Sequence, residues 1–214
     1  TALETLETEQ TSLEKKYRKL AGRVSKQRLA GSESFAAAIT DCMRTLGISD
    51  GTLSLDFSPA ETADGLEKVE FLCVTNPKFP AAPLAKVASG GEQARISLAI
   101  QTVAAEKTRL PTLVLDEADV GVGGTTADVV GRLLRSLATH TQVLCVTHAP
   151  QVAALGQQHL RVHKDAEQDT QIDPLAESGR IDELARMLAG AGVTKKSRDY
   201  ARSLLKEASD TQVH

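Results

Sequence analysis

A serine, two glycines and a glutamate stand together at the predicted start of a long helix. Ser89, Gly90, Gly91 and Glu92 open the helix predicted over residues 91–107. The first turn of a helix leaves backbone N–H groups without partners, and its dipole favours a negative charge there by about 0.3–1 kcal/mol. The segment is therefore a candidate site for a phosphate. A simple N-cap followed by a glycine-rich turn is the alternative interpretation.

Two consecutive carboxylates, Asp116 and Glu117, stand at the end of an apolar strand predicted over residues 110–116. In open α/β sheets ligands bind at the C-terminal edge, and successive residues of a strand point in different directions. Asp116 can therefore hold Mg²⁺, directly or through water, while Glu117 orients and deprotonates an attacking water. The alternative is a charged strand end that faces solvent.

A histidine repeats this arrangement after the next apolar strand. His148 follows the strand predicted over residues 142–147. A histidine at such an edge can donate a hydrogen bond to a γ-phosphate oxygen. Taken alone, the position of His148 favours a structural histidine at a strand end, so its functional interpretation depends on the other two motifs.

In this order the three motifs resemble the C-terminal lobe of an ABC-type ATPase head. Glu92, and Ala118 after the two acids, favour the branch that includes SMC, Rad50, RecF and RecN proteins. Four longer segments resemble the RecN family of bacterial DNA repair proteins: residues 83–92, 116–125, 146–154 and 183–188. The likeness extends from about Gly65 to the C-terminus. Gln93 and Ala149 depart from the family's usual leucines beside two of the motifs.

The resemblance implies an ATP-hydrolysing head that acts in DNA double-strand break repair and recombination, with ATP and Mg²⁺ bound between two heads. It makes Asp116 the Walker B aspartate that binds Mg²⁺, Glu117 the catalytic glutamate and His148 the switch histidine. The other implied residues belong to the signature motif and the D-loop, and they contact the nucleotide site of a second head: Ser89, Gly90, Gly91, Glu92 and Asp119.

The implied partners are the N-terminal P-loop lobe of the same protein, a second copy of the head, and DNA, with double-stranded ends as the expected form. A P-loop needs the pattern G-x-x-x-x-G-K-[ST] after a strand. The sequence has no such pattern, and residues 190–197 only approach it. The isolated chain is therefore predicted to be inactive. The alternatives are another SMC-, Rad50- or RecF-like head, or a lobe with only a structural or dimerising function.

The elements that position these motifs alternate between strands and helices from Leu84 onward. The apolar strands predict a parallel sheet covered on both faces. The expected fold class is α/β, the C-terminal lobe of an ABC/SMC-type P-loop NTPase head with a small β-element and a coiled-coil stub. The remaining predicted elements are strands at 52–57, 69–74 and 160–162, and helices at 34–46, 125–137, 151–155, 181–188 and 194–208.

The N-terminal segment predicts a coiled coil. Alternating three- and four-residue steps, the spacing of a helical seam, connect Leu3, Leu6, Leu13, Tyr17, Leu20 and Val24, with Gln10 and Gln27 at the two remaining seam positions. We therefore expect residues 1–30 to end a coiled-coil arm and residues 31–214 to form the head lobe, with a break at Gly31. Seven cations lie between Lys15 and Arg28 without any acid. They are either a solvated helix face or a contact for a phosphate backbone.

Composition narrows the class further. The net charge is −3, so the overall charge of the chain does not indicate a nucleic-acid binder. No apolar run is long enough for a membrane span and the first residues are not a signal peptide, which predicts a cytoplasmic protein with reduced cysteines. The resemblance to the RecN family implies a bacterial, nucleoid-associated protein. A zinc site is a weaker alternative, from the spacing of Cys145, His148, His159 and His163, because Cys145 lies inside an apolar strand.

Overall fold

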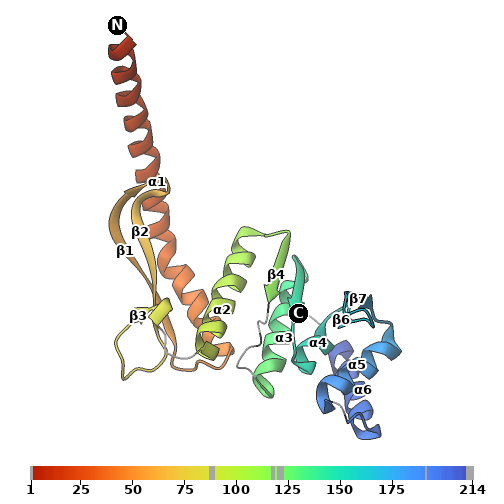
Figure 1. The fold of residues 1–214 in the computed structure, drawn as a ribbon. Coiled ribbons are helices and arrows are strands. Elements are labelled where there is room, and N and C mark those ends of the chain that lie inside the picture. Colours follow the sequence, from red (N-terminus) through yellow and green to blue (C-terminus); the bar gives the residue numbers. More distant parts are fainter. Residues whose placement is uncertain (1, 87–89, 117–118, 120–122, 191, 211–214) are drawn as a thin grey trace. The chain divides into compact units, whose positions relative to one another are not determined.

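The structure, a computed structural model, describes residues 2–86, 90–116, 119, 123–190 and 192–210. The chain divides into two compact units, residues 1–89 and 90–214, whose elements are labelled in Figure 1. Because the two units are separate bodies, each is described by itself.

The first unit begins with one long helix, α1 (Ala2–Thr45). The predicted break at Gly31 is wrong, because the helix continues through this residue and joins the predicted stub to the predicted helix at 34–46. A single glycine inside a helix costs only about 1 kcal/mol relative to alanine, which long flanking helical segments can offset. A β-carbon at Gly31 would also meet no atom within 4 Å, so no close packing forces a bend there.

An antiparallel sheet lies along α1. It contains β1 (Thr52–Thr62), β2 (Gly65–Val74) and the short β3 (Ala82–Pro83), in the order β1-β2-β3. The hairpin β1–β2 is longer than predicted and curves beside the helix (Figure 1). Gly65 takes a φ of 139° at the turn, a conformation that residues with side chains rarely adopt. A 3₁₀ turn (Leu84–Lys86) follows β3.

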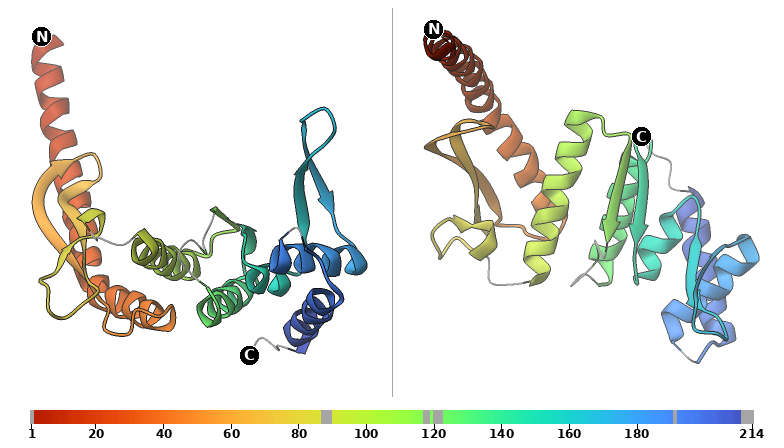
Figure 2. Two further views of the ribbon diagram at one scale, coloured as in Figure 1. Left: turned by 60° about the horizontal axis from the view of Figure 1, so that its bottom comes forward. Right: turned by 45° about the horizontal axis from the view of Figure 1, so that its top comes forward.

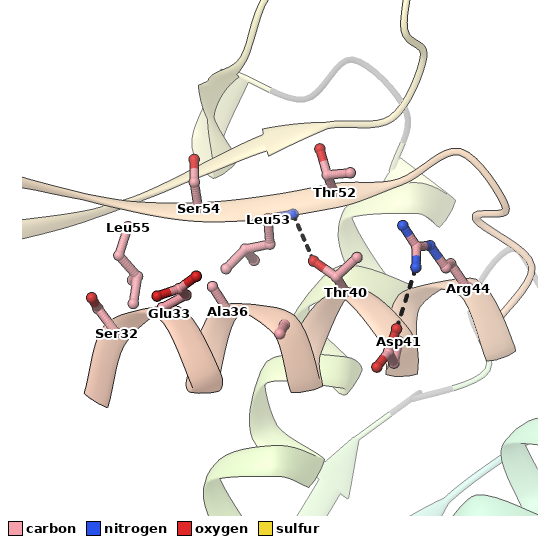
Figure 3. A pocket seen from close by; sticks show the side chains of 11 residues that line it. Ser32, Glu33, Ala36, Thr40, Asp41, Arg44, Thr52, Leu53, Ser54 and Leu55 are labelled. Carbon is pink, nitrogen blue, oxygen red and sulfur yellow. Dashed lines mark hydrogen bonds and ion pairs between the residues drawn. The ribbon is translucent and has the colours of Figure 1, made fainter. Parts of the chain in front are cut away.

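The C-terminal half of α1 and the start of β1 enclose part of the first unit's core. Ile39 and Met43 are fully buried, and Thr40 accepts a hydrogen bond from the backbone N–H of Leu53 across 3.0 Å. Beside this bond lies an open cavity of about 510 Å³ between α1 and β1 (Figure 3). None of the predicted site residues lines it, so the cavity is separate from the predicted chemistry.

The second unit alternates helices and strands, as the sequence predicts. Its elements, drawn in Figures 1 and 2, are α2 (Gly90–Thr108), β4 (Thr112–Asp116), α3 (Thr125–Leu137), β5 (Gln142–Val146), α4 (Pro150–Leu155), β6 (Leu160–Lys164), β7 (Thr170–Pro174), α5 (Glu177–Ala189) and α6 (Lys195–Asp210). β4 and β5 are parallel, whereas β6 and β7 form an antiparallel hairpin. The sequence missed β7, whose five residues are mostly polar and exposed.

Close helix packing organises the second unit. α3 packs against α4 at Gly131, where an added β-carbon would lie 2.6 Å from Leu155 Cδ1 and 3.2 Å from Val152 Cα. A hydrophobic core then joins α4, α5 and α6 through Ala154, Leu184, Ala185 and Ala201. The three alanines allow the helices to approach each other closely.

The β4–β5 pair is covered on one face only, which differs from the predicted sheet covered on both. Leu115 is 4% exposed, whereas Val114 and Val146 on the other face are 65% and 57% exposed. Val114 stands opposite Leu144 in the register, so these apolar side chains form one continuous exposed surface. Within the described residues of the second unit no element covers this surface. None of the described helices has an apolar stretch long enough to cross a bilayer.

Candidate functional site

The site lies at the C-terminal ends of two adjacent parallel strands. In the register of β4 and β5, Asp116 stands opposite Val146, so both strands end at the same edge. The sequence specifies this pairing through two apolar runs of equal length, each followed by polar residues. As predicted, the structure brings Asp116 to the edge where the segment that contains His148 begins.

Asp116 is exposed at this edge. No group of three or more potential metal-binding side chains occurs within the described ranges. Mg²⁺ does not need such a group, since it commonly binds through one or two carboxylates together with waters and phosphate oxygens. An exposed carboxylate at a strand end therefore fits the ion, and Asp116 is the residue that would hold it.

Asp119 joins the two strand ends. This residue has no exposed surface. Its Oδ2 accepts a hydrogen bond from the Thr147 hydroxyl at 2.6 Å and one from the backbone N–H of Ala149 at 2.9 Å. One carboxylate oxygen thus holds the residues on both sides of His148, and it fixes the path of the chain as it leaves β5.

His148 itself points toward solvent. Its side chain is 68% exposed, and its Nδ1 lies 3.5 Å from Asp119 Oδ2. The backbone on either side is fixed by Asp119 while the ring remains accessible. This geometry suits a histidine that contacts a ligand arriving from outside the unit. The described contacts of Asp119 lie within its own chain, and its D-loop contact with an opposing head stays a prediction.

The glycine-rich segment opens α2 as predicted. The helix begins at Gly90, one residue before the predicted start, and an added β-carbon at Gly90 would meet nothing within 4 Å. Gly91 and Glu92 are part of the first turn, where backbone N–H groups lack helical partners. Two predicted residues, Ser89 and Glu117, lie outside the described residues.

Sequence reasoning identified His148 but not the hydrogen bonds that hold Thr147 and Ala149 on either side of it. The available signal was the polar Thr147 after the apolar run of β5, a position where a hydroxyl needs a partner. The partner, Asp119, is 28 residues away in the sequence. Only the parallel pairing of β4 and β5 brings the two together.

A second polar cluster stands where α4 ends. Arg180 donates hydrogen bonds to the carbonyl oxygens of Gly156 at 2.7 Å and Ala154 at 3.3 Å. Burial, and then the positive charge of Arg180, lower the pKa of His159. In the same cluster, hydrogen bonds from Arg186 lower the pKa of the buried Glu183. These contacts stabilise the end of a helix, which is a structural function.

The described geometry gives the zinc alternative no support. Cys145 lies within β5, and burial, followed by the charge of Asp119, raises the pKa of its thiol to about 11. A zinc ligand must be deprotonated, which this environment opposes. His163 lies 3.6 Å from Asp173 on the β6–β7 hairpin, where the two face each other as a polar pair.

Solved structures with a similar fold include head domains of Smc proteins. The Smc head domain with a coiled coil and joint from Pyrococcus yayanosii matches 85% of this chain and 34% of its own, with a TM-score of 0.64 at 18% identity. The Smc head domain with an extended coiled coil from Pyrococcus furiosus, bound to the C-terminal domain of ScpA, matches 86% of this chain and 45% of its own, with a TM-score of 0.62 at 17% identity. The fold is therefore that of an SMC-type ATPase head preceded by a coiled-coil helix.

Curated relatives with higher sequence identity are RecN proteins. The DNA repair protein RecN of Xylella fastidiosa is 41% identical over 202 residues, 91% of this chain and 36% of the relative. RecN of Vibrio cholerae is 42% identical over 191 residues, 86% of this chain and 34% of the relative. This chain is a RecN homologue, and it spans about a third of the length of these relatives. No family model matches it.

Proposed function

We propose that this chain is the C-terminal half of an ATP-hydrolysing head that acts in bacterial DNA double-strand break repair, in the cytoplasm at the nucleoid. The observation that supports this most directly is the joint edge of β4 and β5. There Asp116 and the His148 segment emerge side by side, and Asp119 links them through Thr147 at 2.6 Å. The homology to RecN supplies the biological process.

The proposed chemistry is positioning and electrostatic stabilisation. Bound at Asp116, Mg²⁺ would neutralise charge on the β- and γ-phosphate oxygens. Glu117 orients the attacking water and accepts its proton. His148 donates a hydrogen bond to a γ-phosphate oxygen from its exposed position. The signature residues of the facing head supply backbone N–H groups to the same phosphate: Ser89, Gly90, Gly91 and Glu92.

The P-loop lobe of the same protein is the proposed cover for the exposed face of β4 and β5. Val114, Leu144 and Val146 are 65%, 46% and 57% exposed. Parallel sheets normally have both faces covered, and each apolar side chain that becomes buried contributes about 1.5–3 kcal/mol. Asp116 stands on the same face as this apolar surface, opposite Val146. A P-loop lobe that covers this surface would therefore bring the phosphates of its bound nucleotide near Asp116.

The decisive experiment mixes this chain with a P-loop lobe of the same protein and measures Mg-ATPase activity with and without DNA ends. We expect turnover only from the mixture, because the sequence has no P-loop pattern. Glu117→Gln in the mixture should preserve ATP binding and arrest turnover. Full turnover by that variant would remove Glu117 from the proposed mechanism, and hydrolysis by the chain alone would contradict the division into two lobes.

A second experiment tests whether the P-loop lobe covers the exposed face of β4 and β5. Leu144→Asp introduces a charge in the middle of the exposed apolar surface, away from the predicted site residues. We expect this variant to remain folded and to lose association with the P-loop lobe in analytical size exclusion. Gln142→Asp, on the same face but at the strand's exposed start, is the matched control and should retain association. Equal association of both variants would locate the docking surface elsewhere.

A further inference from the structure

One side of α1 contacts the β1–β2 hairpin. The Tyr17 hydroxyl donates to the carbonyl oxygen of Thr62 at 2.6 Å, Arg18 pairs with Glu61 at 3.1 Å, and Arg28 donates to the carbonyl oxygen of Asp64 at 3.0 Å. Arg28 also pairs with Glu67 at 3.6 Å, and Ser25 bonds the same glutamate. Two acids of the hairpin, Glu61 and Glu67, thus form ion pairs with two of the seven cations between positions 15 and 28.

The other five cations lie on a different side of the helix. At about 100° per residue, they fall within roughly 100° of the helix circumference. All five are exposed, and within the described part of the chain none makes an ion pair or a side-chain hydrogen bond: Lys15, Lys16, Lys19, Arg23 and Lys26. We call these five residues the basic face. No acid lies between Lys15 and Arg28, so the face has an uncompensated charge of about +5 at neutral pH.

The coiled-coil seam is a third, separate side. Leu6, Leu13 and Leu20 are 62%, 55% and 59% exposed, and with Val24 they form a stripe. At about 100° per residue, the centre of this stripe lies roughly 110–120° from the centre of the basic face. A second helix packed on the seam would therefore leave Lys15, Lys19 and Lys26 accessible.

We propose that the basic face binds the phosphate backbone of double-stranded DNA. From Lys15 to Lys26 the helix rises about 16 Å, enough to reach several phosphates of one duplex. The residues are mostly lysines on a helix surface, without aromatic side chains among them, which suits sequence-independent contact with phosphates and not the reading of bases. The hairpin acids are bound to Arg18 and Arg28 on another side, so they do not neutralise the face.

The proposal is tested with this chain and a fluorescein-labelled blunt duplex, without nucleotide. The test variant changes Lys15, Lys16, Lys19 and Lys26 to Gln. The matched control changes four other exposed lysines, which have no ion pair among the described residues, to Gln: Lys107, Lys195, Lys196 and Lys206. Both variants therefore lose the same charge, and glutamine has nearly the helix propensity of lysine. Circular dichroism verifies that α1 remains helical.

Fluorescence anisotropy between about 50 and 200 mM salt gives the readout. We expect the test variant to bind the duplex at least about tenfold more weakly at the lower salt, with a log–log salt slope reduced by about 3–4, whereas the control stays near the parent chain. Equal losses of duplex binding in both variants would overturn the proposal. So would a parent chain that binds polyglutamate, a polyanion without phosphates, but does not bind the duplex. Because no ATP is present, failure here leaves the proposed hydrolysis untouched.

Discussion

The Thr147 hydroxyl donates to the buried Oδ2 of Asp119 across 2.6 Å, and this bond ties the end of β5 to the residue that follows the Asp116–Glu117 pair by two positions. A hydrogen bond to a charged, buried acceptor contributes about 1.5–3 kcal/mol. A double-mutant cycle of Asp119→Ala and Thr147→Val, measured by urea unfolding, should therefore give a coupling energy in this range. The cycle isolates the pair from the separate cost of burying a carboxylate.

The exposed pair Asp128–Arg132, at 2.7 Å on α3, is the control cycle. Solvent-exposed pairs four residues apart in a helix couple by only about 0.3–0.5 kcal/mol. If the Asp119–Thr147 coupling is no larger than that of the control, the bond does not fix the His148 segment.

Gly131 is predicted to be irreplaceable because of its packing, although it lies within a helix. Gly131→Ala gains about 1 kcal/mol of helix propensity but places a β-carbon 2.6 Å from Leu155 Cδ1 and 3.2 Å from Val152 Cα. Overpacking of this kind costs about 1–3 kcal/mol, and the backbone atom of Val152 cannot rotate away. We expect a net loss of unfolding free energy in urea titration.

The contrast with Gly22 makes this prediction sharp. Gly22 also lies inside a helix, but a β-carbon there would meet nothing within 4 Å. Gly22→Ala should therefore raise the unfolding free energy by about 0.5–1 kcal/mol. If Gly131→Ala also raised the unfolding free energy, α3 and α4 would not approach closely at Gly131.

The sequence predicted the parts of the site that depend on local pattern. Apolar runs followed by Asp116 and by His148 specify two parallel strands with a shared edge, and the structure has this pairing. It did not predict contacts between distant residues, such as that of Asp119 with Thr147, because the local pattern shows that the Thr147 hydroxyl needs a partner but not which distant residue supplies it. The continuous helix through Gly31 was missed for a different reason. A glycine in the sequence indicates a loss of helix stability, but it does not indicate that the flanking helical segments offset this loss.

The exposed face of β4 and β5 shows a limit of another kind. Val114 and Leu144 have the residue types of a buried parallel strand, so the sequence predicts burial, whereas the structure leaves them 65% and 46% exposed. No described element of the second unit covers these two side chains. Sequence pattern reports the environment that a residue requires, and it does not report which segment supplies that environment.

The stability of the second unit should fall as the pH is lowered through the titration range of histidine. Burial, then the charge of Arg180, hold the pKa of His159 below its ordinary value of 6.5, with Glu183 acting in the opposite direction. Between the folded and unfolded pKa values the unfolded state binds more protons, so stability rises with pH there. The urea midpoint should therefore decline as the pH falls from above 7 through 6.5 and level off below the folded pKa.

His159→Gln should flatten this pH dependence, since the residue no longer titrates. His140→Gln is the control, because His140 is an exposed histidine in the turn before β5. The control should keep the parent's pH dependence. If His159→Gln keeps it as well, the dependence arises from another group.

The thiol of Cys145 should report the charge of Asp119. Burial is the larger cause and the charge of Asp119 the second in raising the pKa of Cys145 to about 11. Only the thiolate reacts with disulfide reagents, so in a variant with Cys42→Ser and Cys73→Ala the remaining thiol should react slowly at neutral pH. Its rate should increase about tenfold per pH unit between pH 7 and 9, because the thiolate fraction grows in that proportion below the pKa.

Asp119→Asn in the same background keeps the size of the side chain and an acceptor for Thr147 but removes the negative charge. The pKa of Cys145 should then fall, and labelling at a fixed pH should be faster than in the parent. Asp128→Asn, at an exposed position on α3, is the matched control and should leave the rate unchanged. Unchanged labelling in Asp119→Asn would mean that the Asp119 carboxylate does not lie near β5 in solution, and with it the link between the two strand ends would be lost.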